Sequence, residues 1–328
     1  MHIVPLLVAA TLVGGLTPAH GQTRAGNGAE GYPSRPVRWI VPFPPGGAAD
    51  IVSRVVAQRL AESWSQQVVI DNRSGAAGNL GIELAARATP DGHTVVLVPA
   101  TFATYASLSR KPSYDALRDF APVTLVSTSP LVLVVHPAVQ AKTVQELIAL
   151  ARSRPQQLNY ASSGVGASAH LAAELFRSGA GVQITHVPYK GQPPAIVDLI
   201  GGQVHLMFPN MPSVMSHIKS GKLRPLGISS EQRSTLFPQL PTIAESGLPG
   251  YEVTQWGGLV TRAGTPPAIV ARLQRDIAAV LDLAEVRANF AAQGLDPVAN
   301  TPAQFAHFLR SETAKWGKLI RDAGITAE

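Results

Sequence analysis

The chain repeats one local pattern, in which a buried apolar segment turns sharply through Gly, Pro or Ser into the start of a helix. The first copy, IVPFPPGGAADIVSRVVAQRL, breaks at a proline and resumes with apolar residues at helical spacing. The copies span residues 40–60, 71–81, 160–170 and 187–195. Because the strand ends of a parallel sheet lie along one edge, these turns predict a ligand site in the crevice that they form.

The residue types in these turns indicate what the site binds. A helix N-terminus presents unpaired N–H groups and about half a positive charge. Glycine removes the side chain that would keep a ligand away from the backbone. We therefore predict an anionic guest, and a carboxylate is the simplest choice.

Apolar runs without polar alternation separate the helical patterns, as expected for strands covered on both faces. We predict an α/β fold of two lobes, each a mostly parallel sheet flanked by helices, with the ligand in the cleft between them. Lobe 1 is predicted over residues 35–128 and 252–328, and lobe 2 over 129–251. We expect a hinge of two crossover strands near 125–131 and 224–230, with the C-terminal helices packed on lobe 1.

The N-terminal segment predicts export. Residues 1–21 contain an apolar run with no acidic residue, Lys or Arg, followed by Ala19-His20-Gly21, which suits a signal peptidase. A membrane anchor is the alternative, but the run is shorter than the ~20 residues of a spanning helix. Residues 22–34 are polar and glycine-rich, and predict a flexible mature N-terminus. The chain has no cysteine to carry a lipid anchor. An exported binding protein without an anchor stays with the cell only where an outer membrane retains it, so we expect a Gram-negative periplasmic location.

The charge distribution and the sequence motifs disfavour a nucleic-acid-binding protein and a nucleotide-dependent protein. The 27 Lys and Arg and 21 Asp and Glu give a net charge of +6, but the basic residues are dispersed, so we expect no nucleic-acid partner. No P-loop occurs, and the Gly-x-Gly-x-x-Ala match at 164–169 lacks a downstream acid for a nicotinamide cofactor. We expect no cofactor.

Clustered Ser and His residues raise the question of catalysis. Ser162, Ser163, Ser168 and His170 lie close together in the sequence, but no Gly-x-Ser-x-Gly elbow and no metal-ligand spacing is present. We expect a non-enzyme. An α/β-type enzyme, either a hydrolase or nicotinamide-dependent, is the alternative, as is a ligand sensor that feeds a signalling partner.

Asp50 falls in the first turn of the first predicted helix. There a carboxylate either complements the helix dipole or contacts the ligand. It would repel a bound carboxylate directly, but it would orient loop amides, waters or a ligand amine.

Several motifs together resemble one family. VPFPPGGAADIVSR, IDNRSGAAGNLG, YASSGVGASAHLAAELF, HVPYKGQPPAIVDLIGGQV and PTIAESGLPGYEVTQWGGLVTRAGTPPAIV occur in order from about Tyr32 to the C-terminus. They resemble the Bug family, the TctC-like substrate-binding proteins of tripartite tricarboxylate transporters. The resemblance implies a periplasmic solute-binding protein of the type II-like two-lobed kind that closes on its ligand for transport. It implies membrane permease subunits as partners and no catalysis, and we expect a monomer.

The resemblance also implies the ligand-binding residues. They are Phe43, Pro45, Gly46, Gly47, Asp50, Ala77, Gly78, Asn79, Thr101, Ser162, Ser163, Gly166, His170, Tyr189, Lys190 and Asn210. In the family, backbone amides and bridging waters hold the carboxylate. Where relatives often read VDLMFDN, this chain has His205 and Pro209 in place of two acids. The loss of an amine-binding acid favours organic mono- or dicarboxylates, aliphatic or aromatic, over amino acids.

Overall fold

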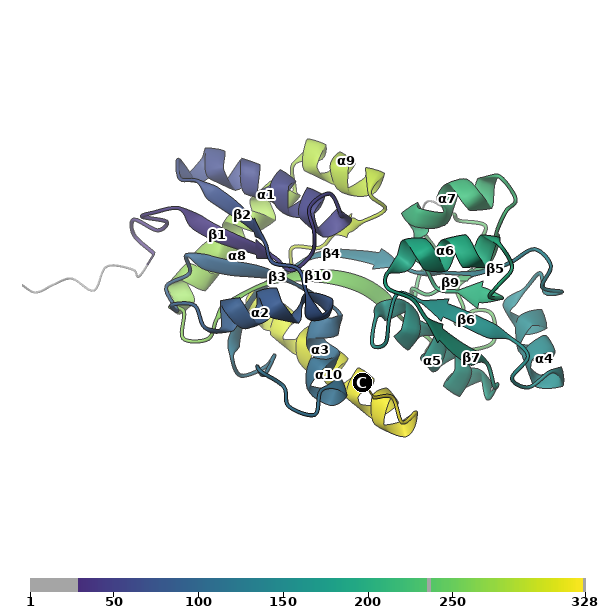
Figure 1. The fold of residues 1–328 in the computed structure, drawn as a ribbon. Coiled ribbons are helices and arrows are strands. Elements are labelled where there is room, and N and C mark those ends of the chain that lie inside the picture. The colour runs from purple at the N-terminus through teal and green to yellow at the C-terminus, as the bar shows by residue number, and fades with distance from the viewer. Residues whose placement is uncertain (1–28, 235–236, 327–328) are drawn as a thin grey trace, which may run out of the picture.

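The computed structural model describes residues 29–234 and 237–326, which form two α/β units side by side (Figure 1). Lobe 1 denotes the unit with the 6-stranded sheet, and lobe 2 the unit with the 5-stranded sheet. The strands are β1 (Val37–Val41), β2 (Val68–Asn72), β3 (Thr94–Pro99), β4 (Phe120–Pro130), β5 (Val132–Val135), β6 (Asn159–Ser162), β7 (Thr185–Pro188), β8 (Leu206–Met207), β9 (Arg224–Ile228), β10 (Thr254–Arg262) and β11 (Asp296–Pro297). The helices are α1 (Ala48–Trp64), the 3-10 helix η1 (Ala76–Gly78), α2 (Asn79–Ala86), α3 (Thr101–Leu108), α4 (Val144–Ser153), α5 (Ser168–Ala180), α6 (Gln192–Ile200), α7 (Met211–Lys219), α8 (Pro267–Leu281), α9 (Ala284–Ala292) and α10 (Pro302–Asp322). The predicted α/β class is confirmed.

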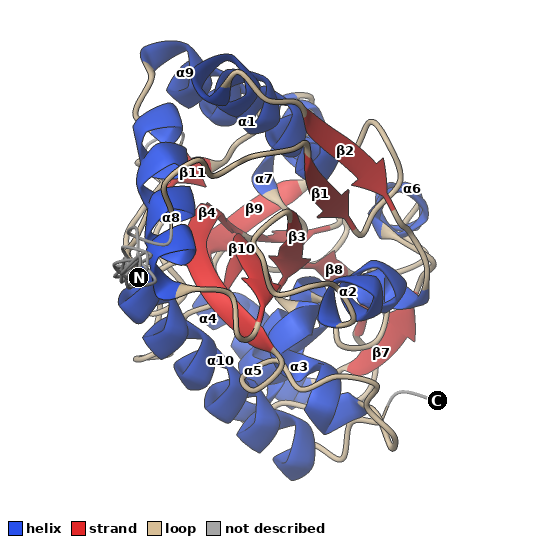
Figure 2. Ribbon diagram, turned by 90° about the vertical axis from the view of Figure 1, so that its left-hand side faces the viewer, coloured by secondary structure: helices blue, strands red, loops and turns tan. Residues whose placement is uncertain are grey.

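The sheet of lobe 1 has the strand order β11-β4-β10-β3-β1-β2. Strands β1, β2 and β3 are parallel, whereas β10 is antiparallel to its neighbours β3 and β4. Helices α1, α8 and α9 share an apolar cluster with one face of this sheet, and α2, α3 and α10 with the other (Figure 2). This sheet is therefore mixed and covered on both faces.

The sheet of lobe 2 has the order β7-β6-β8-β5-β9. Strands β6, β7 and β8 are parallel, and β5 is antiparallel to β8 and β9. Helices α4 and α5 pack on one face, and α6 and α7 on the other. Parallel pairing is thus confined to β1–β3 and β6–β8, although β4 and β9 run in the same direction as these strands. The reason is that β10 and β5 each enter their sheet from the other lobe, and so run against the strands that end at the cleft.

The chain passes twice between the sheets. The first passage, from β4 into β5 at residues 130–132, matches the first predicted crossover. The second prediction, 224–230, is wrong, because β9 pairs with β5 inside lobe 2. Residues that follow β9, including Ile243, Leu248 and Val253, belong to the lobe 2 core. The return passage is therefore at the start of β10, Thr254.

Helix α10 spans both lobes, running beneath them in Figure 1. Phe305 and Leu309, near its start, are buried in the core of lobe 1. Trp316, Leu319 and Ile320, farther along, are buried in the core cluster of lobe 2. The prediction that the C-terminal helices pack on lobe 1 is therefore incomplete, because the last turns of α10 contribute to the other lobe.

The predicted signal peptide, residues 1–21, and most of the predicted flexible segment, 22–34, lie outside the described residues. Within residues 29–234 and 237–326, no helix combines the length and apolar character needed to cross a membrane.

Candidate functional site

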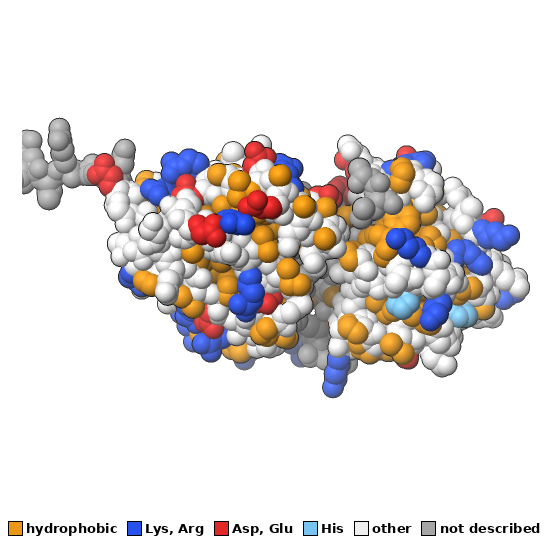
Figure 3. All heavy atoms as spheres, turned by 90° about the horizontal axis from the view of Figure 1, so that it is seen from above, with side chains coloured by type: hydrophobic (Ala, Val, Ile, Leu, Met, Phe, Trp, Pro, Cys, Tyr) orange, Lys and Arg blue, Asp and Glu red, His pale blue; other side chains and the backbone are white. Residues whose placement is uncertain are grey.

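A cavity of 280 Å³ lies where the two lobes face each other. A groove between the lobes is visible from above in Figure 3. We call this space the cleft cavity. Its lining residues are Phe43, Pro99, Ala100, Thr101, Leu131, Ser163, Ala167, Ser168, Ala169, Gly191, Gln192, Phe208 and Gln255. Both lobes contribute, so a guest in the cleft cavity would contact both.

Three helix N-termini meet at the cleft cavity. The N-cap residues of α3, α5 and α6 are Ala100, Ala167 and Gly191, and each of them lines it. None of these three ends is capped by a side chain. The first amides of α3 and α5 have no acceptor within their helices. At α6 the Gly191 amide donates to Ser163 O at 3.2 Å, and Pro193 and Pro194 have no N–H. The cavity therefore receives unpaired donors mainly from α3 and α5, and positive helix-dipole ends from both lobes.

The side chains of the cleft cavity carry hydroxyls, amides and apolar groups but no charge. The hydroxyl oxygen Oγ1 of Thr101 is buried without a hydrogen-bond partner. Leaving such a group unpaired costs about 1–3 kcal/mol. An acceptor on a bound guest would recover that cost. The arrangement therefore suits an anion held by dipoles and neutral donors rather than by an Arg or Lys clamp.

Asp50 stabilises the loop that joins β1 to α1 in lobe 1. It is 3% exposed. Its carboxylate accepts hydrogen bonds from the Gly46 amide at 2.9 Å, Arg54 Nε at 2.9 Å and Asn72 Nδ2 at 2.9 Å. The hydrogen bond from Arg54, with those from Gly46 and Asn72, lowers its pKa to about 2. Since Asn72 Nδ2 also donates to the Phe43 carbonyl at 3.0 Å, Asp50 orients the loop and does not line the cleft cavity.

The second predicted loop of lobe 1 is also engaged internally. The backbone of Ala77 lies in η1, and the Gly78 amide donates to Gly75 O at 2.9 Å. Asn79 Oδ1 accepts from the Tyr114 hydroxyl at 2.6 Å. None of the predicted residues of this loop lines the cleft cavity.

Two stacked imidazole rings contact the loop that joins β6 to α5 in lobe 2. The rings of His170 and His186 are 4.1 Å apart at 16°. His170 Nδ1 accepts from the Gly166 amide at 3.0 Å, and His186 Nε2 lies 2.7 Å from Ser162 Oγ. Burial lowers the pKa of each histidine to about 4. Both rings are therefore neutral near pH 7, and they shape the loop that leads into α5.

Ser162 and His186 resemble a nucleophile and base by distance alone. Ser162, however, is 0% exposed, so no substrate carbonyl reaches its hydroxyl in this conformation. The buried carboxylate of Glu174 accepts from Tyr160 at 2.5 Å rather than from either histidine. Among the described residues, no group of His, Asp and Glu could hold a metal ion.

The remaining predicted residues of lobe 2, Tyr189, Lys190 and Asn210, do not line the cleft cavity. The Tyr189 hydroxyl donates to Asp198 at 2.7 Å, and burial raises its pKa to about 12. Lys190 is exposed. Asn210 Oδ1 accepts from Gln192 Nε2 at 3.0 Å, and Ser213 accepts from the same amide group. Asn210 thus positions Gln192, which does line the cavity.

The predicted glycines have backbone roles. Gly46 has φ +85° and Gly166 has φ +77°, values that favour glycine. A Cβ on Gly166 would lie 2.3 Å from Leu108 Cδ1. Because both amides are already donated within their own loops, the turn itself explains these glycines. Pro45 and Gly47 are exposed beside them.

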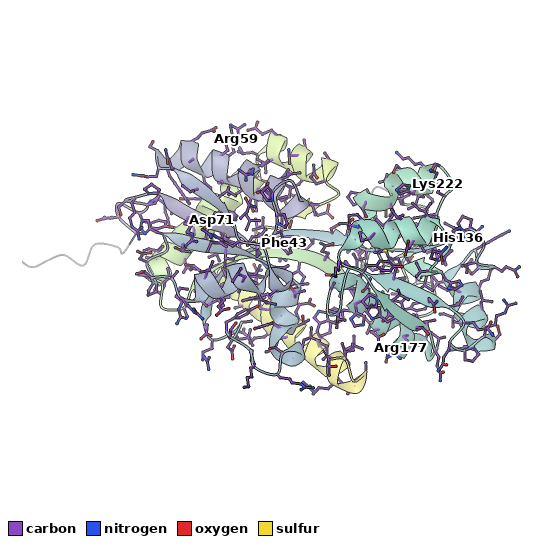
Figure 4. All side chains as sticks on the ribbon, in the orientation of Figure 1. Phe43, Arg59, Asp71, His136, Arg177 and Lys222 are labelled. Carbon is purple, nitrogen blue, oxygen red and sulfur yellow. The ribbon has the colours of Figure 1, made fainter. Side chains whose placement is uncertain are left out.

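The structure therefore brings three predicted residues to the cavity, namely Phe43, Thr101 and Ser163. Figure 4 places Phe43 on the side of lobe 1 that faces lobe 2. Sequence reasoning missed Gln192 and Gln255. Gln192 directly precedes the two prolines that open α6, which is a usable signal. Gln255 precedes a Trp-Gly-Gly run, and nothing local marks that run as a strand.

Comparison with known proteins agrees with this geometry. The family model of the tripartite tricarboxylate transporter family receptor, TctC, matches residues 52–325. The protein BugT of Bordetella pertussis is 42% identical over 298 residues, which is 90% of this chain and 91% of the relative. A UPF0065 protein of the tcbD-tcbE intergenic region of Pseudomonas sp. is 38% identical over 91% of this chain and 89% of the relative.

Solved structures show the same similarity. Rpa4515 of R. palustris with adipate has a TM-score of 0.79 at 37% identity, covering 90% of this chain and 99% of that one. MatC of Rhodopseudomonas palustris with bound malate has a TM-score of 0.75 at 31% identity, covering 88% of this chain and 100% of that one. The fold is therefore that of the two-lobed periplasmic binding proteins, and the chain belongs to the TctC family of solute-binding receptors, which includes the Bug proteins.

Proposed function

We propose that this protein captures a small organic carboxylate in the cleft cavity and presents it to the membrane subunits of a tripartite tricarboxylate transporter. The observation that carries this proposal is the meeting of three uncapped helix N-termini around a cavity without charged side chains. Such a site stabilises a single negative charge through dipoles. The adipate and malate in two structural relatives support the same class of ligand.

The residues divide into two groups. Thr101, Ser163 and the free amides at the start of α5 contact the carboxylate directly. Asp50, the His170–His186 pair and Asn210 hold the loops that present those donors. In keeping with the family, the protein acts in the periplasm without catalysis, and we propose that it does so as a monomer.

Ligand capture requires closure of the lobes. We propose that residues 35–128 with 252–328, apart from the last turns of α10 that pack in lobe 2, and residues 129–251 move as two bodies about the passages at 130–132 and Thr254. Thr101 is on lobe 1 and Ser163 on lobe 2, so a carboxylate that binds both favours the closed state. A ligand at 100 times its dissociation constant adds about 2.7 kcal/mol to stability. That corresponds to about 5–10 °C in melting temperature for units of this size.

The test combines mass spectrometry of ligand retained through purification with titration of candidate carboxylates. We expect a rise in melting temperature, a smaller radius of gyration in X-ray scattering and recovery of each carboxylate unchanged. The double variant Thr101→Val with Ser163→Ala should lose both effects, whereas Ser178→Ala, an exposed position near the end of α5, should keep them. Turnover beyond one equivalent, or equal shifts in the double variant and the parent, would refute the proposal.

A further inference from the structure

A second, smaller cavity of 90 Å³ lies inside lobe 1, and we call it the inner cavity. Its lining residues are Phe43, Ala49, Val52, Leu97, Val98, Pro99, Ser127, Gln255, Trp256, Gly257 and Leu295. Phe43, Pro99 and Gln255 also line the cleft cavity. The two spaces are therefore neighbours that share one wall, and the inner cavity extends along the first turns of α1, where Ala49 and Val52 line it.

The lining of the inner cavity is mostly apolar and carries no charged side chain. Its uncharged polar side chains include Ser127 and Gln255, and the indole N–H of Trp256 is already donated to Glu312 at 3.0 Å. The nearest acid on α1 is Asp50, which lies between the lining residues Ala49 and Val52 and is fully hydrogen-bonded to other partners. No lining side chain carries a positive charge for a second carboxylate, and the Asp50 carboxylate in the first turn of α1 already complements the positive end of that helix.

We propose that the inner cavity receives the apolar tail of the ligand, so that the protein selects monocarboxylates with an aliphatic or small aromatic tail over dicarboxylates. This inference rests on the proposed function, because the carboxylate must first be held in the cleft cavity. Phe43 then lies beside the bound tail at the entrance to the inner cavity.

Physical chemistry gives the expected selectivity. A water molecule needs about 10–15 Å³ of cavity volume. The inner cavity of 90 Å³ therefore holds several heavy atoms of a ligand tail. Each buried methylene contributes about fourfold in affinity. A second carboxylate would lose its hydration without gaining a charged partner, which is costly. A terminal hydroxyl is tolerated, because an apolar pocket discriminates weakly against an added hydroxyl.

The experiment is calorimetric titration of the full-length mature protein with butanoate, hexanoate, 6-hydroxyhexanoate, adipate and monomethyl adipate. Hexanoate should bind about fifteenfold more tightly than butanoate, since it buries two more methylenes. Adipate should bind at least about tenfold more weakly than hexanoate, and monomethyl adipate should recover most of that loss because esterification removes the second charge.

Two variants test the location. Ala49→Leu fills the inner cavity and should flatten the dependence of affinity on chain length. Ala61→Leu, on the same helix but outside the lining, should keep the dependence of the parent. Val52→Ala enlarges the inner cavity and should move the preferred ligand to a longer chain, which keeps the test open if Ala49→Leu fails to fold.

The outcomes separate the two proposals. Adipate binding as tightly as hexanoate, or affinity independent of chain length, overturns the tail site and leaves carboxylate capture standing. Loss of dicarboxylate affinity in Lys190→Met, with adipate the preferred ligand of the parent, also overturns it, because the second carboxylate would then contact the exposed Lys190 and not enter the inner cavity. If none of the carboxylates binds, the proposed function fails and the tail site with it.

Discussion

Replacing Asp50 with Asn should destabilise the protein in a manner that depends on pH. The carboxylate accepts three hydrogen bonds, from Gly46, Arg54 and Asn72, and is 3% exposed. These contacts lower its pKa from 3.8 to about 2. One pKa unit corresponds to about 1.4 kcal/mol, so the ionised form contributes about 2 kcal/mol to stability at pH 7.

The sign of the pH dependence follows from the direction of the shift. Because the folded-state pKa of Asp50 lies below its unfolded value, its contribution is complete above pH 4 and is lost as the pH falls through 2. At pH 3 about half of it, or about 1 kcal/mol, remains. The stability difference between the parent and Asp50→Asn should therefore shrink by about 1 kcal/mol between pH 7 and pH 3.

Urea unfolding followed by circular dichroism at both pH values measures this difference. Asp282→Asn is the matched control, because its carboxylate side chain is 76% exposed and pairs with an exposed Arg287, and such pairs contribute about 0–1 kcal/mol. The titration of buried histidines is common to parent and variant and cancels. A difference that stays constant with pH, or one no larger than that of the control, would refute the role assigned to Asp50.

Three further substitutions have defined outcomes. Thr101→Val should lower carboxylate affinity about tenfold in calorimetry and raise the stability of the ligand-free protein by up to about 1–3 kcal/mol, because the buried hydroxyl that it removes has no partner in the protein; unchanged affinity would exclude the contact. Between pH 7 and pH 5, the variant His186→Phe should lose less unfolding free energy than the parent protein, as measured by urea unfolding at both pH values. Burial lowers the pKa of His186 from 6.5 to about 4, so the parent loses stability as the pH falls below 6.5; equal losses would contradict this. Gly258→Ala should cost about 1–3 kcal/mol in urea unfolding, since its Cβ would lie 2.1 Å from the Phe305 ring. Gly47→Ala, whose nearest contact is 3.9 Å, is the control, and equal stability of the two variants would argue against this packing.

Local patterns predicted much of the architecture. Unbroken apolar runs and Gly or Pro punctuation placed α1, α5 and most of the strands, because these signals act through contacts close in sequence. The same turns predicted that helix N-termini meet at one anion site. The sequence also marked Thr101 and Ser163, through resemblance, as residues of that site.

Strand β10 shows what local patterns do not predict. Its Gly257-Gly258 pair is typical of a turn, yet it lies in the middle of the lobe 1 sheet. Gly258 is required because the ring of Phe305 packs directly on the strand, and a side chain there would collide with it. That contact joins β10 to α10, which come from separate parts of the sequence.

The candidate site likewise has features that local sequence predicts and features that depend on the tertiary structure. Sequence by itself determined the α/β class, the dipole-rich turns and the preference for an anion, since these depend on residue type and short-range spacing. Only the tertiary structure decided which side chains line the cavities and which hold the loops. Asp50 and Tyr189 have the residue types of ligand contacts, but distant partners such as Asn72 and Asp198 already satisfy them. Hydrogen-bond satisfaction and burial depend on the packing of the whole chain, and neither can be read from the spacing of residues within one turn.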